Sequence, residues 1–269
     1  MFHGNFTFPP ITDFHVEYAV DEDVKIEKAK IFPPHIHDTL EFYVHLEGDA
    51  SFVVEDKIYK ISPGDVVISR PNELHNCILH TESIHKSASF WLDTSAFFLL
   101  SNFLDETSER LLSPKKEERE KISALCRKLM DAGTKGEKNR IFYLLLELLD
   151  TFKRNISVGA KVELKNVPPV LKKILEDLNE NFAKIDKLDY FVKKYFISQS
   201  TLNRLFKTHL HTSPKLYLET KKLAYSRVLL KEGKRVVDVC KEAGFPDYSN
   251  FIRLFKKRFS VTPKEYQSR

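Results

Sequence analysis

The chain is poor in glycine and contains none of the glycine-rich loops that bind phosphate groups. Its 269 residues include only 8 glycines, against about 19 expected at the average usage of roughly 7%. Neither the G-x-G-x-x-G pattern of dinucleotide-binding folds nor the G-x-x-x-x-G-K-[ST] pattern of nucleotide triphosphatases occurs. The sequence therefore gives no support to a nucleotide-binding enzyme of either class.

Cysteines and long apolar runs are also scarce. The three cysteines, Cys77, Cys126 and Cys240, form no C-x-x-C pair, so we expect neither a disulfide framework nor a thiolate zinc site. The N-terminus lacks the basic and apolar segments of a secretion signal. The most apolar stretch, residues 141–149, is interrupted by Glu147 and is too short to cross a membrane. These absences predict a cytoplasmic protein without a membrane segment.

Charge is distributed very unevenly along the chain. Residues 1–110 contain 8 Lys and Arg against 19 Asp and Glu, a net charge of −11. Residues 165–269 contain 23 against 11, a net charge of +12, although the whole chain carries only +5. This asymmetry indicates an acidic module joined to a basic module that contacts a polyanion. Ordinary solvated surfaces are the alternative explanation.

The hydrophobic pattern predicts three parts. Residues 1–93 read as short strands with turns and no intervening helices, which is typical of an antiparallel barrel or sandwich. Residues 94–160 are expected to be a helical connector, with helices over 115–130, capped by Ser113, and over 137–154. Residues 157–169 are the best linker candidate, and residues 165–269 are predicted to be nearly all helical.

The basic part contains an internal repeat. Shifting the chain by 49 residues aligns positions 196–217 with 245–266, and 9 of the 22 positions are identical, where chance predicts about one. Each copy reads as helix, tight turn and helix, with Ser198 and Asp247 as the N-caps of the second helices. One long helix after Ser213 and Pro214 is expected to join the copies. The polar residues that begin each second helix suit reading of a DNA major groove.

The second copy carries a specific resemblance. The run VVDVCKEAGF (236–245), followed by YSNFIRLFKK (248–257) and TPKEY (262–266), resembles the signature of AraC/XylS-type transcriptional regulators. That resemblance covers residues 165–269 and implies a domain with two helix-turn-helix units that enter successive segments of the major groove. By register, the implied contacts to double-stranded DNA are Gln199, Ser200, Asn203, Arg204, Lys207, Tyr248, Ser249, Asn250, Arg253 and Lys256. The connector helices are expected to form a homodimer, although their apolar stripe could equally pack on the barrel of the same chain, and RNA polymerase is expected as a further partner.

Histidines gather in the acidic part. His35 and His37 form an H-x-H pair four residues before Glu41, and His75 follows a second turn. Three imidazoles and a carboxylate that converge inside a barrel suit a transition metal ion. The pattern resembles the first motif of the cupin superfamily, which implies a jelly-roll barrel. AraC-type sensor domains commonly keep such residues as a small-molecule pocket, so we expect His35, His37, Glu41, Tyr43 and His75 to line an effector site.

Two functions follow from these features. The first is a DNA-binding transcriptional regulator, not an enzyme, whose cupin-like domain senses a small molecule and thereby changes DNA binding. A sugar is one candidate, because Tyr43 offers a stacking surface. The alternative is a metal-dependent cupin enzyme with a DNA-binding tail, which requires a metal on His35, His37, Glu41 and His75; no other cofactor is expected.

Overall fold

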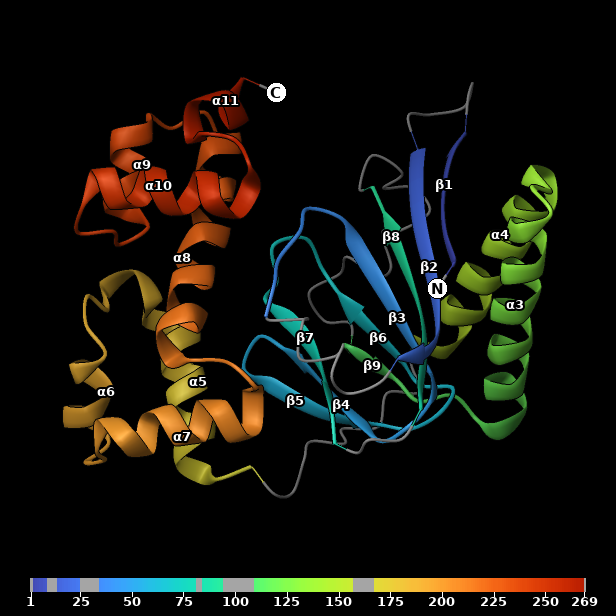
Figure 1. The fold of residues 1–269 in the computed structure, drawn as a ribbon, viewed down its shortest axis with the longest axis horizontal. Helices are drawn as coiled ribbons and strands as arrows, with labels where there is room; N and C mark the ends of the chain where they lie inside the picture. The colour runs from blue at the N-terminus through green and yellow to red at the C-terminus, as the bar shows by residue number, and fades with distance from the viewer. Residues whose placement is uncertain are drawn as a thin grey trace.

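The computed structural model describes residues 2–8, 14–24, 34–80, 84–93, 109–156 and 167–268. They form an N-terminal part of two antiparallel sheets with two flanking helices, and a C-terminal part built from helices (Figure 1). We name these the barrel domain and the helical domain. This arrangement confirms the predicted combination of an antiparallel β fold with a helical region. Within the described residues no helix is both long and apolar enough to span a membrane.

The barrel domain contains a six-stranded sheet and a three-stranded sheet. The six-stranded sheet has the order β1-β2-β8-β3-β6-β9, and the three-stranded sheet has the order β5-β4-β7. Their bounds are β1 Phe2–Phe8, β2 Phe14–Val24, β3 Leu40–Glu47, β4 Ala50–Val54, β5 Lys57–Ile61, β6 Val66–Ser69, β7 His75–Leu79, β8 His85–Leu92 and β9 Leu111–Leu112. Every described pairing is antiparallel.

Alternation of side chains along β3 separates two apolar layers, one on each face of the larger sheet. Tyr43 and Val67 of the larger sheet meet Phe52 and Tyr59 of the smaller one in a core between the sheets. The opposite face of β3 packs against helices α3 (Lys116–Thr134) and α4 (Lys138–Asn155), where the rings of Phe42 and Phe152 stack 5.1 Å apart. The connector helices thus pack their apolar stripe on the barrel of their own chain. The predicted cap at Ser113 is wrong, because α3 begins at Lys116 without a side-chain cap.

The helical domain contains the two predicted helix-turn-helix units. Its elements are α5 Pro169–Asn181, η3 Phe182–Lys184, α6 Asp189–Lys194, α7 Gln199–Leu210, α8 Pro214–Lys231, α9 Val236–Glu242, α10 Tyr248–Phe259 and α11 Pro263–Gln267. The first unit is α6 with α7 and the second unit is α9 with α10. Ser198 and Asp247 cap α7 and α10 through their side chains, as the sequence predicts. Most of the predicted linker, residues 157–166, lies outside the described residues.

The turns of the two units differ in length by one residue. The left-handed position after the first helix is held by Phe196 (φ 50°) in the first unit and by Gly244 (φ 78°) in the second. The alignment of Phe196 with Phe245 is therefore wrong in three dimensions, because Ile197 occupies the place of Phe245. Phe196 is 95% exposed, whereas Phe245 is buried in the core of the second unit.

The two domains share an apolar core. Val53, Ile58 and Ile78 point from the outer face of the three-stranded sheet and cluster with residues of α5, α7 and α8. This second packed face explains why β4 is buried at every position, since its other face lines the space between the sheets. The helical domain therefore packs directly against the three-stranded sheet of the barrel domain.

Candidate functional site

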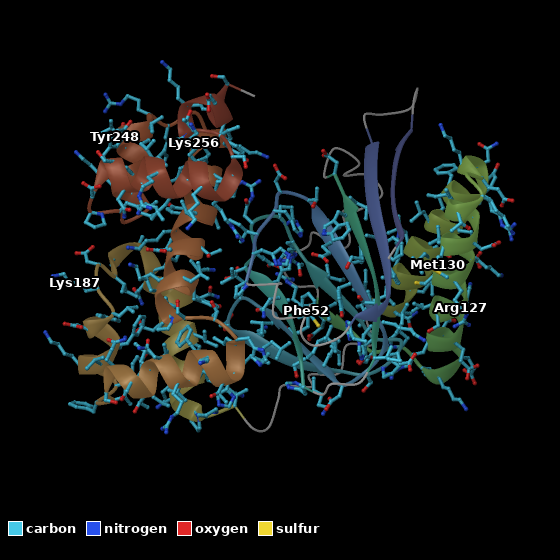
Figure 2. The ribbon with its side chains drawn as sticks, in the orientation of Figure 1. Phe52, Arg127, Met130, Lys187, Tyr248 and Lys256 are labelled. Carbon is cyan, nitrogen blue, oxygen red and sulfur yellow. The ribbon has the colours of Figure 1, made fainter. Side chains whose placement is uncertain are left out.

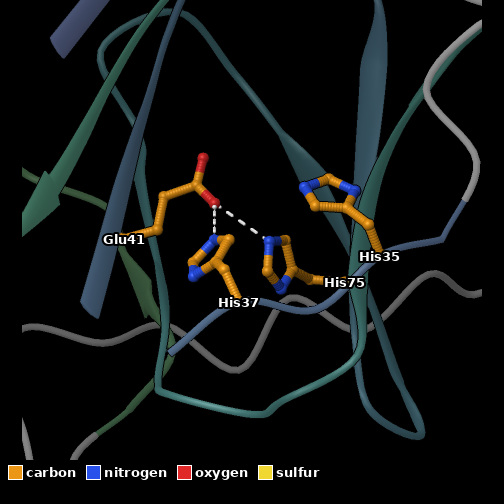
Figure 3. Close-up of side chains that lie close together, drawn as sticks. All are labelled: His35, His37, Glu41 and His75. Carbon is orange, nitrogen blue, oxygen red and sulfur yellow. Dashed lines mark hydrogen bonds and ion pairs between the residues drawn. The ribbon is translucent and has the colours of Figure 1, made fainter. Parts of the chain in front are cut away.

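The four residues predicted to hold an effector or a metal lie close together in the barrel domain (Figure 3). His35, His37, Glu41 and His75 each direct one ligand atom into the group, and these atoms all lie within 4.8 Å of one another. We call this group the histidine cluster. Residues before β3 supply the two histidines of the H-x-H pair, β3 supplies Glu41 and β7 supplies His75. A pair of backbone hydrogen bonds between His35 and His75 holds the two segments together.

Glu41 is the centre of charge in this cluster. Its Oε2 lies 2.9 Å from Nε2 of His37 and 2.9 Å from Nε2 of His75, and its side chain is almost fully buried. Burial alone would raise the pKa of the carboxyl, but the contacts with His37 and His75 hold that pKa well below its ordinary value. Burial opposes the charged form of His75, and Glu41 nevertheless raises the pKa of this imidazole. The site therefore holds an ionised carboxylate beside a histidine that favours its cationic form.

The geometry fits a single transition metal ion. Nδ1 of His75 donates to the carbonyl of Glu73 at 2.9 Å, which directs Nε2 of the same ring into the cluster. This Nε2 is fully buried and makes no well-aligned hydrogen bond, although it lies beside Glu41. Three imidazoles and one carboxylate form a donor set that suits zinc, nickel or iron. Binding of an ion would displace the proton of His75, so metal affinity would fall at low pH.

Tyr43, the fifth predicted pocket residue, lies apart from the cluster. Its hydroxyl is 2.7 Å from Nε2 of His85 and 3.3 Å from Sγ of Cys77. The ring of His85 stacks on that of His45 at 5.3 Å, and both histidines are buried. Sequence reasoning missed this second polar group, because nothing in the spacing of His45 and His85 distinguishes a buried histidine from an exposed one. Phe52 lies between the two groups, with its ring against both Tyr43 and His75.

The predicted DNA-contacting residues lie on two exposed helix faces. The side chains of α7 and α10 in the predicted set are exposed except for that of Asn250, which is half-buried. Nη2 of Arg253 donates to Oδ1 of Asn250 at 2.7 Å, so the two side chains act as one pair. Figure 2 shows Tyr248 at the end of α10 that lies farther from the barrel and Lys256 further along the same helix. Phe196 adds an exposed aromatic ring two residues before the cap of α7, a feature that the repeat alignment concealed.

Residues 34–40 connect the histidine cluster to the helical domain, and we name them the shared segment. While His35 and His37 face the cluster, Asp38 lies 2.9 Å from the guanidinium of Arg227 and 3.3 Å from Nζ of Lys231, both on α8. The carbonyl of Pro34 accepts a hydrogen bond of 3.2 Å from Arg258 at the end of α10. Burial opposes ionisation of Asp38, but Arg227 and Lys231 lower the pKa of its carboxyl.

A second contact joins the domains at the turn between β4 and β5. Glu55 adopts φ 56° in this turn, and its carbonyl accepts a hydrogen bond of 2.6 Å from the hydroxyl of Tyr217. Its carboxylate forms an ion pair with Lys221. Oδ1 of Asp56 accepts a hydrogen bond of 2.9 Å from Asn179 on α5. The hairpin thus holds the first half of α8, and the shared segment holds the second half.

Comparison with known proteins agrees with both halves of this description. A family described as an AraC-like ligand binding domain matches residues 27–149, and a helix-turn-helix domain family matches residues 191–269. The chain is 26% identical over 248 residues to the HTH-type transcriptional activator RhaS of Salmonella schwarzengrund, covering 87% of each chain. It is 27% identical over 250 residues to the protein of the same name from an Enterobacter species, again covering 87% of each.

The solved structures that match the chain include ToxT from Vibrio cholerae, with 12% identity, 95% and 97% of the two chains covered and a TM-score of 0.38. They also include the DNA-binding domain of AdpA in complex with a target DNA, with 19% identity, 37% and 90% coverage and a TM-score of 0.35. The two family matches lie on the barrel domain and on the helical domain respectively. The chain therefore belongs to the AraC-type family of transcriptional regulators, which join a ligand-binding domain to a helix-turn-helix DNA-binding domain.

Proposed function

We propose that this protein is a transcriptional activator whose DNA binding changes when a small polar molecule occupies the histidine cluster. The named relatives are activators, which supports activation as the direction of control. The two exposed recognition faces supply sequence-specific contacts to double-stranded DNA, with Arg204 and Arg253 as the strongest base-reading candidates. The histidine cluster supplies the effector site, where imidazole and carboxylate groups recognise hydroxyl or amine groups of the effector.

The shared segment is the observation that carries this proposal. Two of its side chains, His35 and His37, belong to the cluster, while Asp38 between His37 and β3 contacts α8. An effector that moves or fixes His35 and His37 therefore also acts on the adjacent Asp38, which forms an ion pair with Arg227 of the helical domain. An effector shifts an equilibrium only by its differential affinity for two states. The contacts of Asp38 and Pro34 with the helical domain would distinguish two such states if they are formed in one and broken in the other.

A transition metal is the second candidate occupant, because the donor set and the buried Nε2 of His75 suit one. When bound, such an ion would supply a positive charge and an open coordination position to the cluster. The same observation favours the alternative function, a metal-dependent cupin enzyme fused to a DNA-binding domain. His35, His37, Glu41 and His75 would hold the metal in either case. No further cofactor is proposed.

We also propose that the regulator acts as a homodimer that contacts RNA polymerase. Tyr143 on α4 is 68% exposed, and Phe142, Leu146 and Leu149 on the same helix are only partly covered by the barrel. This stripe offers an apolar surface to a second copy of the chain. Two copies would double the number of DNA segments that the protein reads. Activation requires recruitment of the polymerase, so it is the natural protein partner.

The decisive experiment uses the full chain. DNA sites are first selected from a random-sequence pool, and sugars, other metabolites and divalent metals are then screened by thermal shift. We expect at least one compound to raise the melting temperature and to change the affinity for the selected DNA, and we expect both effects to disappear in Glu41→Gln. His80→Gln serves as the matched control, since His80 lies outside the cluster. Failure to select any DNA sequence would refute the proposed regulator. Turnover of a metabolite only by the metal-loaded protein would also refute it, in favour of the metal-dependent enzyme.

A further inference from the structure

The two recognition helices lie at opposite ends of α8 (Figure 1). An α-helix of 18 residues spans about 27 Å, somewhat less than the 34 Å of one DNA turn. Reading two successive major-groove segments therefore depends on how the first unit is placed against the second. Their apolar cores are separate, because α8 contributes Tyr217 and Leu218 to one and Leu229 and Leu230 to the other.

The second unit meets residues 182–185, which lead from α5 into the first unit, at a small seam beside the middle of α8. Gly244, in the turn of the second unit, packs so closely on η3 that a Cβ there would lie 2.0 Å from the carbonyl oxygen of Ala183. The rings of Phe182 and Tyr225 make an edge-to-face contact at 5.5 Å next to it. We name these contacts, together with those of Lys222, the inter-unit seam.

Lys222 is the polar residue at the centre of this seam. Its side chain is almost fully buried, at 4% exposure. Its Nζ donates to the carbonyl of Ile185 at 2.8 Å, in the first half of the domain, and to the carbonyl of Gly244 at 2.5 Å, in the second half. The same atom lies 5.9 Å from the centre of the Phe245 ring. One ammonium group therefore links α8 to a backbone carbonyl on each side of the seam.

Burying an ammonium group is unfavourable unless hydrogen bonds compensate it. Burial lowers the pKa of Lys222, while the carboxylates of Asp186 and Glu219 act in the opposite direction. A methionine or leucine would fill the same space without that cost, so apolar packing alone does not require a lysine. The lysine instead contributes geometric specificity, because its two hydrogen bonds form together only when the carbonyls of Ile185 and Gly244 lie in one relative position.

Resting on the DNA-binding function proposed above, we propose that Lys222 is a positioning residue that fixes the spacing between the two DNA segments the protein reads. It touches no DNA itself. By holding the turn of the second unit against the end of η3, it fixes α10 relative to α7. The protein then accepts only DNA in which the two recognised segments are separated by one set number of base pairs.

The test compares DNA sites that differ only in spacing. A site selected by the wild-type protein is altered by inserting or deleting one base pair between the two recognised segments. We expect the wild-type protein to lose about 100-fold in affinity, because one unit then loses its base contacts. Lys222→Met is expected to bind the parental site about tenfold more weakly and to lose less than about fivefold on the altered sites. Lys222→Arg, which keeps the charge and the donors, should restore most of the wild-type discrimination.

Lys215→Met is the matched control, because Lys215 lies on the same helix with its side chain 76% exposed. It should keep the wild-type response to spacing. Lys222→Gln is the second variant if the methionine variant does not fold, and it should shift discrimination in the same direction. A methionine or glutamine variant that weakens binding equally at all spacings would overturn the proposal, as would a wild-type protein that is indifferent to spacing. Failure of the wild type to bind any DNA selectively would instead refute the proposed function.

Discussion

The carboxylate of Asp38 lies 2.9 Å from the guanidinium of Arg227, and this ion pair joins the barrel domain to α8 directly beside the histidine cluster. Arg227 is almost fully buried and its guanidinium also lies over the rings of Phe259 and Tyr266. The pair therefore has a rigid partner on the helical side. On the barrel side it depends on a backbone segment that an effector would touch.

Replacement of Asp38 by asparagine tests this connection. Asp38→Asn removes the charge that pairs with Arg227 and Lys231 but leaves the four cluster residues unchanged. We expect normal effector or Zn²⁺ affinity by calorimetry and a smaller effect of occupancy on DNA affinity, reduced to less than half of its wild-type free energy. Asp49→Asn is the control, since Asp49 pairs with Lys60 within the barrel domain. An unchanged occupancy effect in Asp38→Asn would contradict the coupling.

Glu41 is expected to dominate ligand affinity in the histidine cluster. Glu41→Gln keeps the size of the side chain but removes the negative charge that faces His37 and His75. Zn²⁺ affinity should fall by at least tenfold, because the cluster loses its anionic ligand. Titration calorimetry with His80→Gln as the control checks this result. Equal affinities for the two variants would place the metal elsewhere.

The two recognition helices should respond differently to loss of arginine and of lysine. Arg204→Ala should cost about 1–3 kcal/mol on the selected DNA site and relax the sequence preference, because a bidentate contact to guanine is lost. Lys256→Ala should weaken binding to all DNA alike and reduce the salt dependence of the affinity. Binding isotherms on specific and random DNA at two salt concentrations separate these effects. An equal loss of affinity for specific and random DNA in Arg204→Ala would show that Arg204 does not contact a base.

Acidification should destabilise the fold through the buried histidines near Tyr43. Burial, assisted by His45, lowers the pKa of His85 from its ordinary 6.5 to about 4. Because this folded-state pKa is depressed, the unfolded chain binds a proton that the native state excludes as the pH falls from 6.5 toward 4. The free energy of unfolding should drop by about 3 kcal/mol over this range, at roughly 1.4 kcal/mol per pH unit. Urea unfolding at several pH values should show a flatter profile for His85→Gln, and identical profiles would exclude His85 as the cause.

Phe196 is expected to reduce the stability of the protein. It holds a left-handed backbone conformation that favours glycine, and its ring is almost entirely exposed. Phe196→Gly should therefore raise the free energy of unfolding by about 1 kcal/mol. Chemical denaturation measures the change directly. A loss of stability would mean that the ring makes contacts that compensate for its backbone strain.

Local features of the sequence were sufficient to predict the caps of α7 and α10 and to indicate which residues form the histidine cluster. Ser198 and Asp247 cap their helices because a hydroxyl or carboxylate before a helical pattern satisfies free backbone amides, whatever the rest of the fold does. The H-x-H spacing indicated that His35 and His37 belong to one site, but both precede β3, and their convergence with Glu41 also depends on the backbone pairing of His35 with His75. The two caps, by contrast, rest on short-range geometry alone.

The predictions that failed, and the contacts that were missed, depend on long-range packing. The cap expected at Ser113 is absent, and the start of α3 instead follows β9, which pairs with β6. Phe196 was aligned with a buried phenylalanine because the sequence cannot show that one turn is a residue shorter. The pairing of Asp38 with Arg227 joins residues from opposite halves of the chain, and no local pattern marks either one.

The apolar face of the three-stranded sheet limits how this regulator can switch. Val53, Ile58 and Ile78 are buried in a cluster with residues of the helical domain. Full separation of the domains would expose this apolar face of the sheet to solvent, and exposed apolar sheet surfaces favour aggregation. A signal from the effector must therefore travel by small rearrangements of the ionic contacts around a closed interface. For the same reason, cutting the chain between its domains should yield fragments that are less soluble than the intact protein.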